Sequence, residues 1–251
     1  MPAATLWSDL VTVGRHLARH LTMASLGPVE AVVFDVGGVL TASPLPAIAR
    51  YAAELGVPAR ELAMALAGST AFALLECGLI DVDEACARLD REVQLRLGTE
   101  AAAGFAAADM FAVLRNALRP RPEVLQLVAE IAGAGLAIGI LTNNWKGAEP
   151  PRELRDLVPR AVVVESRLEA MRKPGPAIFA RMLDRLGVAP GAVVFLDDIG
   201  ANVKTARLLG MHTIKVPASE EVYGEAFDEL ALVLRERNGL NIALGQVRSK
   251  L

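Results

Sequence analysis

Residues 31–40 read AVVFDVGGVL: four apolar residues, then an aspartate and, one residue later, a pair of glycines. An apolar run without polar alternation is typical of a parallel strand that is buried on both faces. Four similar runs follow, at 137–141, 161–164, 192–196 and 213–216. Helical patterns lie between or after them, at about 121–134, 150–157, 174–187, 200–209 and 219–236. This alternation predicts an α/β fold with a doubly wound parallel sheet.

A long insertion follows the first strand. Residues 43–118 contain amphipathic helical patterns and no strand pattern, and the Arg-Pro-Arg-Pro stretch at 119–122 is typical of a return linker. Asp81 with Glu84 three residues later predicts a helix start, and Gly56 predicts a helix end. We therefore predict a core of 29–42 and 119–251 with a small helical cap at 43–118. Residues 1–28, with apolar residues at roughly helical spacing, are interpreted as an N-terminal extension and not a targeting signal.

Composition excludes several classes of function. The net charge is −3 and no basic stripe with interleaved aromatics occurs, which argues against nucleic-acid binding. No apolar run approaches the ~20 residues that span a bilayer, so no membrane partner is expected. Cys77 and Cys86 are too few for a disulfide scaffold, so free thiols and a cytoplasmic location are predicted. The sequence leaves open whether the chain forms a homodimer.

Polar residues gather where the predicted strands end. Because ligands bind at the carboxyl ends of the strands in open α/β sheets, these residues are candidates for one shared site. They are Asp35 after the first strand, Thr142 and Asn143 after the second, Asp197 and Asp198 at the end of the fourth, and Lys173 ahead of the helix that leads into the fourth.

Three carboxylates in one crevice would repel one another and be driven toward protonation unless a cation compensates them. Hard oxygen ligands with room for retained water suit Mg²⁺. Lys173 offers a fixed positive charge and Thr142 a hydroxyl, which together form a clamp for a phosphoryl group. Each residue alone has an ordinary explanation, such as a helix cap or a solvated loop. Their occurrence together, in order along one sheet, indicates a catalytic site.

These residues resemble the motifs of the haloacid dehalogenase superfamily of phosphohydrolases. Within the resemblance, VVFLDDIGANVKTARLLGMHTI at 193–214 is similar to the N-terminal phosphatase domain of soluble epoxide hydrolases. DVGGVLTASP at 35–44 is similar to the related domains that are fused to some acyl-CoA dehydrogenases.

The resemblance implies a role for each residue. Asp35 would be the nucleophile that forms an aspartyl-phosphate, and Mg²⁺ would be held by Asp35, Asp198 and the Gly37 carbonyl, with Asp197 in support. Phosphate would be bound by Thr142, Asn143 and Lys173. Asn202 would position the loop of the fourth motif or contact the substrate. The expected substrate is a small phosphorylated metabolite.

One position departs from the phosphatase pattern. These enzymes usually carry a second aspartate two residues after the nucleophile, where this chain has Gly37. Loss of such a general acid–base typically lowers rates by ~10²–10⁴. Three interpretations therefore stay open: a Mg²⁺-dependent phosphomonoesterase, a 2-haloacid dehalogenase-like hydrolase, and a weakly catalytic or non-catalytic binding module.

Overall fold

The five predicted strands form one parallel sheet. The computed structural model describes residues 27–100, 102–150 and 152–242. Its strands are β1 Ala31–Phe34, β2 Ala137–Thr142, β3 Val162–Glu165, β4 Val193–Asp197 and β5 His212–Lys215, in the order β3-β2-β1-β4-β5. All four neighbouring pairs are parallel, with β1 between β2 and β4. The predicted doubly wound α/β fold is confirmed, and β1 occupies the centre of the sheet.

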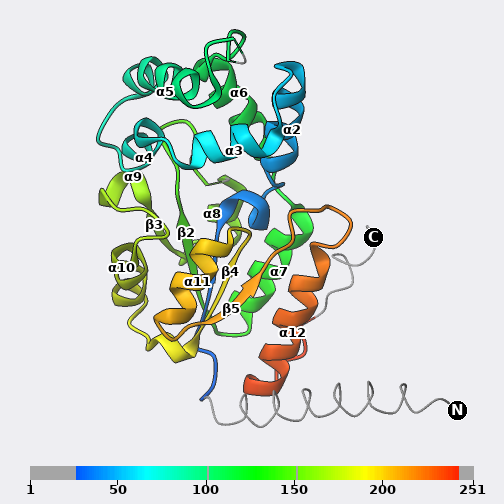
Figure 1. Cartoon of the computed structure of the whole chain (residues 1–251). Coiled ribbons are helices and arrows are strands. Elements are labelled where there is room, and N and C mark those ends of the chain that lie inside the picture. The colour runs from blue at the N-terminus through cyan, green and yellow to red at the C-terminus, as the bar shows by residue number, and fades with distance from the viewer. Residues whose placement is uncertain (1–26, 101, 151, 243–251) are drawn as a thin grey trace, which may run out of the picture.

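Helices cover both faces of the sheet (Figure 1). Val32 and Phe34 of β1 belong to the hydrophobic cluster that includes α7 (Pro122–Gly133) and α12 (Gly224–Asn238). Ala31 and Val33 belong to the opposite cluster, with α10 (Pro176–Leu186) and α11 (Gly200–Leu208). Because side chains alternate along a strand, four consecutive apolar residues fill two separate cores. This explains why the run lacks polar alternation.

The insertion after β1 is entirely helical within the described residues. It contains α2 Leu45–Glu54, α3 Ala59–Ala67, α4 Thr70–Glu76, α5 Val82–Leu97 and α6 Ala107–Ala117, which share a third hydrophobic cluster. Asp81 caps α5 by accepting a hydrogen bond from the Glu84 backbone N–H at 2.8 Å, as predicted. Gly56 follows the end of α2 with φ 69°, as a helix stop requires. The exact domain boundaries stay a prediction.

The cap contacts the core through α4 and α6. Trp145, three residues beyond Thr142, packs against Phe72 and Phe111 of the cap with ring centroids 5.5–5.7 Å apart. The Glu76 carboxylate pairs with Arg172 of the core at 2.6 Å. The Glu76 backbone carbonyl accepts a hydrogen bond from Ser166 Oγ at 2.5 Å. The cap is therefore held against the loops that follow β2 and β3 as well as by its two linkers.

Other elements agree closely with the predicted ones, with one exception. The remaining elements are η1 Val36–Leu40, α8 Arg152–Leu157, α9 Ser166–Glu169 and η2 Pro190–Ala192. The predicted helix at 219–236 begins five residues late, because 219–223 form a turn in which Ser219 Oγ accepts from the Glu221 N–H at 3.2 Å. Cys77 and Cys86 are free thiols.

No helix within the described residues is long and apolar enough to cross a membrane. Of the N-terminal extension predicted at 1–28, residues 1–26 lie outside the described residues. The cytoplasmic location stays a prediction.

Candidate active site

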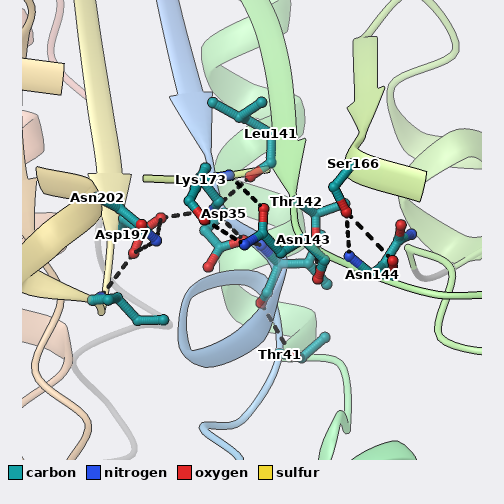
Figure 2. Close-up of polar contacts among 12 residues, drawn as sticks. Asp35, Thr41, Leu141, Thr142, Asn143, Asn144, Ser166, Lys173, Asp197 and Asn202 are labelled. Carbon is teal, nitrogen blue, oxygen red and sulfur yellow. Dashed lines mark hydrogen bonds and ion pairs between the residues drawn. The ribbon is translucent and has the colours of Figure 1, made fainter. Parts of the chain in front are cut away.

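The carboxyl ends of β1, β2 and β4 bring the predicted residues to one edge of the sheet. Asp35 directly follows β1, Thr142 ends β2 and Asp197 ends β4. Figure 2 shows Lys173 among them, with Asp35 on one side and Asp197 on the other. Asp35, Asp197 and Asp198 each present an oxygen within 4.8 Å of the others. The three carboxylates and the lysine that the sequence predicts as one site therefore do lie together.

Lys173 is the centre of this arrangement. Its Nζ lies 2.8 Å from Asp35 Oδ1 and 2.7 Å from Asp197 Oδ2, and it donates to the Leu141 carbonyl at 2.8 Å. Three acceptors match the three protons of an ammonium, which allows a lysine that is 1% exposed to stay charged. Burial alone would lower the pKa of Lys173, but the charges of Asp197 and Asp35 outweigh it and raise this pKa above its usual value.

Asn143 positions the lysine. Its side-chain amide donates to the Lys173 carbonyl at 2.9 Å and accepts from the Lys173 backbone N–H, also at 2.9 Å. Both ends of the amide are used, so this side chain fastens the loop after β2 to the loop that carries Lys173. The side chain of Asn143 is thus engaged within the protein.

Both oxygens of the Asp197 carboxylate accept hydrogen bonds within the protein. Oδ1 accepts from the Ile199 backbone N–H at 2.7 Å and from Asn202 Nδ2 at 3.0 Å. Oδ2 accepts from Lys173 Nζ at 2.7 Å and from Asn202 Nδ2 at 3.0 Å. Asp197 is 0% exposed. This geometry suits a residue that positions Lys173, and it accounts for Asn202, whose amide contacts Asp197.

The site carries excess negative charge. When all three carboxylates are ionised, the single ammonium leaves two negative charges uncompensated. Burial, with the nearby Asp197 and Asp198 charges, raises the pKa of Asp35 to about 8, although Lys173 opposes this shift. Burial and the Asp197 charge likewise raise the pKa of Asp198 to about 6, against the opposing effect of Lys173. A divalent cation would compensate this charge, so the donor set fits Mg²⁺.

The turn after Asp35 makes room for Asp198. Gly38 has φ 75°, and a Cβ built there would lie 2.3 Å from Asp198 Oδ2. Only glycine allows both this backbone conformation and this approach. At Gly37, by contrast, a Cβ would meet Leu118 Cδ2 at 3.6 Å and Pro44 Cδ at 3.9 Å, which are ordinary contacts. Position 37 therefore points toward the two linkers of the cap and has space for a side chain.

Several residues around the site carry no catalytic signal in the sequence. Ser166 Oγ accepts from the Asn144 backbone N–H at 3.0 Å and donates to the cap at Glu76. Ser43, in the first linker, lies 3.5 Å from Asp198 Oδ2. A serine among many others gives no signal in one sequence. The Asn-Asn-Trp stretch after Thr142 is the one local hint, because a large aromatic residue beside a predicted site commonly packs on a neighbouring element.

Strand-end aspartates and a buried lysine between two of them lie at one edge of a parallel sheet that carries a helical cap. The chain belongs to the haloacid dehalogenase-like hydrolases, whose family pattern matches residues 29–210. It is 31% identical over 239 residues to acyl-CoA dehydrogenase family member 10 of Mus musculus, and this match covers 89% of this chain and 22% of the mouse protein. It is 31% identical over 164 residues to bifunctional epoxide hydrolase 2 of Rattus norvegicus, covering 60% of this chain and 29% of the rat protein. Both resemblances predicted from the sequence are confirmed.

This chain therefore spans less than a third of each of these two relatives. The match to phosphatase MT3486 of Mycobacterium tuberculosis extends further, with 28% identity over 76% of this chain and 88% of that protein. The fold is also that of a HAD-like family hydrolase from Porphyromonas gingivalis, with a TM-score of 0.57 and 23% identity over 80% of this chain and 97% of that one. A HAD family enzyme from Bacteroides thetaiotaomicron, solved as a magnesium complex, gives a TM-score of 0.53 with 21% identity over 77% and 96% of the two chains.

Proposed function

We propose that this chain is a Mg²⁺-dependent phosphomonoesterase that acts on a small phosphorylated metabolite through an aspartyl-phosphate on Asp35. The observation that carries the proposal is the ammonium of Lys173, bound at 2.8 Å to Asp35 and at 2.7 Å to Asp197, with Asp198 in the same carboxylate group. Similarity to a protein named as a phosphatase along most of both chains supports phosphate as the group transferred.

The chemistry of the donors suggests how Mg²⁺ would be held. Of the four predicted ligands, the Asp35 and Asp198 carboxylates and the Gly37 carbonyl are the better candidates. Asp197 is the poorer one, since both of its carboxylate oxygens already accept hydrogen bonds within the protein. A bound Mg²⁺ would compensate the excess negative charge and polarise the phosphoryl oxygens. Asp197 would then serve to hold Lys173.

The reaction begins with attack of the Asp35 carboxylate on phosphorus. Among the described residues, both contacts of this carboxylate, to Lys173 and to the Val36 N–H, involve Oδ1, which leaves Oδ2 without a protein contact. A new P–O bond forms to Asp35 while the ester P–O bond breaks, and the leaving oxygen takes its proton from water, because position 37 is a glycine. Water then attacks the aspartyl-phosphate, releasing phosphate and restoring the carboxylate. The Thr142 hydroxyl and the positive charge of Lys173 stabilise the phosphoryl oxygens, and Lys173 also opposes the rise in the pKa of Asp35 that burial causes.

The test is phosphate release from an aryl phosphate by the purified chain, with Mg²⁺ and with a chelator. The Asp35→Asn variant should lose turnover while keeping the melting temperature of the fold, because a neutral amide is not a nucleophile. Asp184→Asn, an exposed carboxylate on α10, is the matched control and should behave as wild type. Acid-quenched wild type should also carry a phosphate adduct on the peptide that contains Asp35.

Turnover that survives Asp35→Asn would overturn the nucleophile assignment. Chloride release from a 2-haloacid, without phosphate release from any ester, would favour the dehalogenase-like alternative. Magnesium binding with neither reaction would favour a binding module.

A further inference from the structure

A second buried cation, Arg121, lies behind the turn that follows Asp35. It comes from the return linker of the cap and is 4% exposed. Its Nη1 donates to the Gly38 carbonyl at 3.0 Å and to the Val39 carbonyl at 3.3 Å. Its backbone N–H donates to the Leu40 carbonyl at 3.0 Å. One residue thus holds three successive carbonyls of this turn.

The far side of the guanidinium is also fixed. Nη2 pairs with Glu220 Oε1 at 2.5 Å. The guanidinium carbon lies 4.0 Å from the centroid of the Tyr223 ring, and the Tyr223 hydroxyl donates to Glu123 Oε1 at 2.8 Å. Arg121 is therefore held from the C-terminal half of the core while it holds the turn beside the nucleophile.

The turn needs such a donor. Gly38 interrupts the helical geometry of η1 with φ 75°, and Gly37 is likewise non-helical. A planar guanidinium donates in several fixed directions, so it can serve the Gly38 and Val39 carbonyls and Glu220 together. The compact ammonium of a lysine has the same charge but not this planar set of donors.

The same turn governs the proposed metal site. It carries the Gly37 carbonyl, and Gly38 approaches Asp198 so closely that a Cβ would lie 2.3 Å from Oδ2. A displaced turn would therefore alter the position of the Gly37 carbonyl and its packing against Asp198. We propose that Arg121 is a positioning residue for the magnesium site, acting through the backbone of 37–39. This inference rests on the proposed function, because it assigns a support to the same metal site.

The experiment compares Arg121→Met and Arg121→Lys with wild type by Mg²⁺-dependent melting. Arg119→Met is the matched control, since Arg119 is an exposed arginine of the same linker. Groups that orient metal ligands typically change metal affinity by about 10–100-fold. We expect Arg121→Met to need at least about tenfold more Mg²⁺ for half of the melting shift, with Arg121→Lys recovering little of it and Arg119→Met matching wild type. Half-maximal activation of aryl-phosphate hydrolysis should move by the same factor, while KM at saturating Mg²⁺ changes little.

The outcomes separate this inference from the proposed function. A wild type without any Mg²⁺-induced melting shift would refute the proposed metal site itself. If Arg121→Met shows the same Mg²⁺-induced melting shift as wild type at the same Mg²⁺ concentration, the role of Arg121 is overturned and the proposed metal site is not affected. Full recovery of the wild-type Mg²⁺ dependence in Arg121→Lys would overturn the requirement for a planar guanidinium. If neither Arg121 variant folds, Arg121 is a folding residue and the positioning role is overturned as well.

Discussion

Replacing Lys173 by methionine tests the electrostatic balance of the site. Methionine keeps most of the buried volume and removes only the charge and its hydrogen bonds. With an effective dielectric constant of about 20, a unit-charge pair at 2.8 Å attracts by about 6 kcal/mol, and Lys173 makes two such contacts. Most of this attraction offsets the cost of burying the ammonium. Breaking a buried pair by removing one partner leaves a net loss of about 3–5 kcal/mol.

The loss should depend on pH in a defined direction. In the unfolded chain the site carboxyls ionise near their usual pKa of 3.8, whereas in the fold the pKa of Asp35 is raised to about 8 and that of Asp198 to about 6. The folded state therefore holds more protons across this interval, and stability falls as pH rises through it. Lys173 opposes both shifts, so its removal raises both pKa values further. The deficit of Lys173→Met should therefore be larger near pH 8 than near pH 5.

Thermal melting without Mg²⁺ measures the deficit. For a chain of this size about 1 kcal/mol corresponds to about 2–4 °C, so Lys173→Met should melt roughly 10 °C below wild type near pH 8. Lys204→Met, which removes an exposed lysine on α11, is the matched control and should melt as wild type does. Activity should be lost in Lys173→Met at every pH. A deficit that is equal at both pH values, or larger at the acidic one, would refute the reasoning.

Two further predictions concern the metal and the missing acid. Asp198→Ala should abolish the Mg²⁺-induced rise in melting temperature that wild type gains by mass action. The control Asp184→Ala, on the surface of α10, should keep this rise. A melting shift that survives Asp198→Ala would place the metal elsewhere. In wild type, hydrolysis should fall steeply from aryl to alkyl phosphates, because no acid stands at Gly37 to protonate a poor leaving group. The Cβ of Gly37→Asp has room beside Leu118 and Pro44. This variant should raise the hydrolysis rates of alkyl phosphates by up to ~10²–10⁴, with little change for aryl phosphates. A wild-type hydrolysis rate that does not vary with leaving-group pKa would contradict this prediction.

The sheet could be predicted from the sequence almost residue by residue. The apolar run at 31–34 is the observed β1, and the run at 137–141 ends one residue before β2 does. The other three predicted runs are each shifted by one residue from the observed strands. Burial on both faces explains this success, because it requires an uninterrupted apolar run and so marks the strand in the sequence itself. The strand ends then locate Asp35, Thr142 and Asp197 without any knowledge of the order of the strands.

Contacts between distant segments could not be predicted in this way. Arg121 and Glu220 are far apart along the chain, as are Glu76 and Arg172, and each residue separately has the pattern of an ordinary surface charge. Asn143 is predicted to bind phosphate, which stays a prediction, and nothing in the sequence indicates that its side chain is bonded to the Lys173 backbone. The pairing of an amide with a peptide group in another loop depends on the distance between loops, which periodicity does not encode.

The central position of β1 sets the order in which this protein can assemble. The ribosome makes β1 before either of its neighbours, which begin only at residues 137 and 193, so the strand has no partner on either side while the cap is being made. At ~5–20 residues per second, roughly 160 residues of synthesis leave β1 incompletely paired for on the order of ten seconds. Over this interval its exposed apolar edge is open to aggregation or to chaperones. We therefore expect nascent chains that end before residue 193 to be protease-sensitive around Ala31–Phe34, and chains that extend beyond β4 to become resistant there.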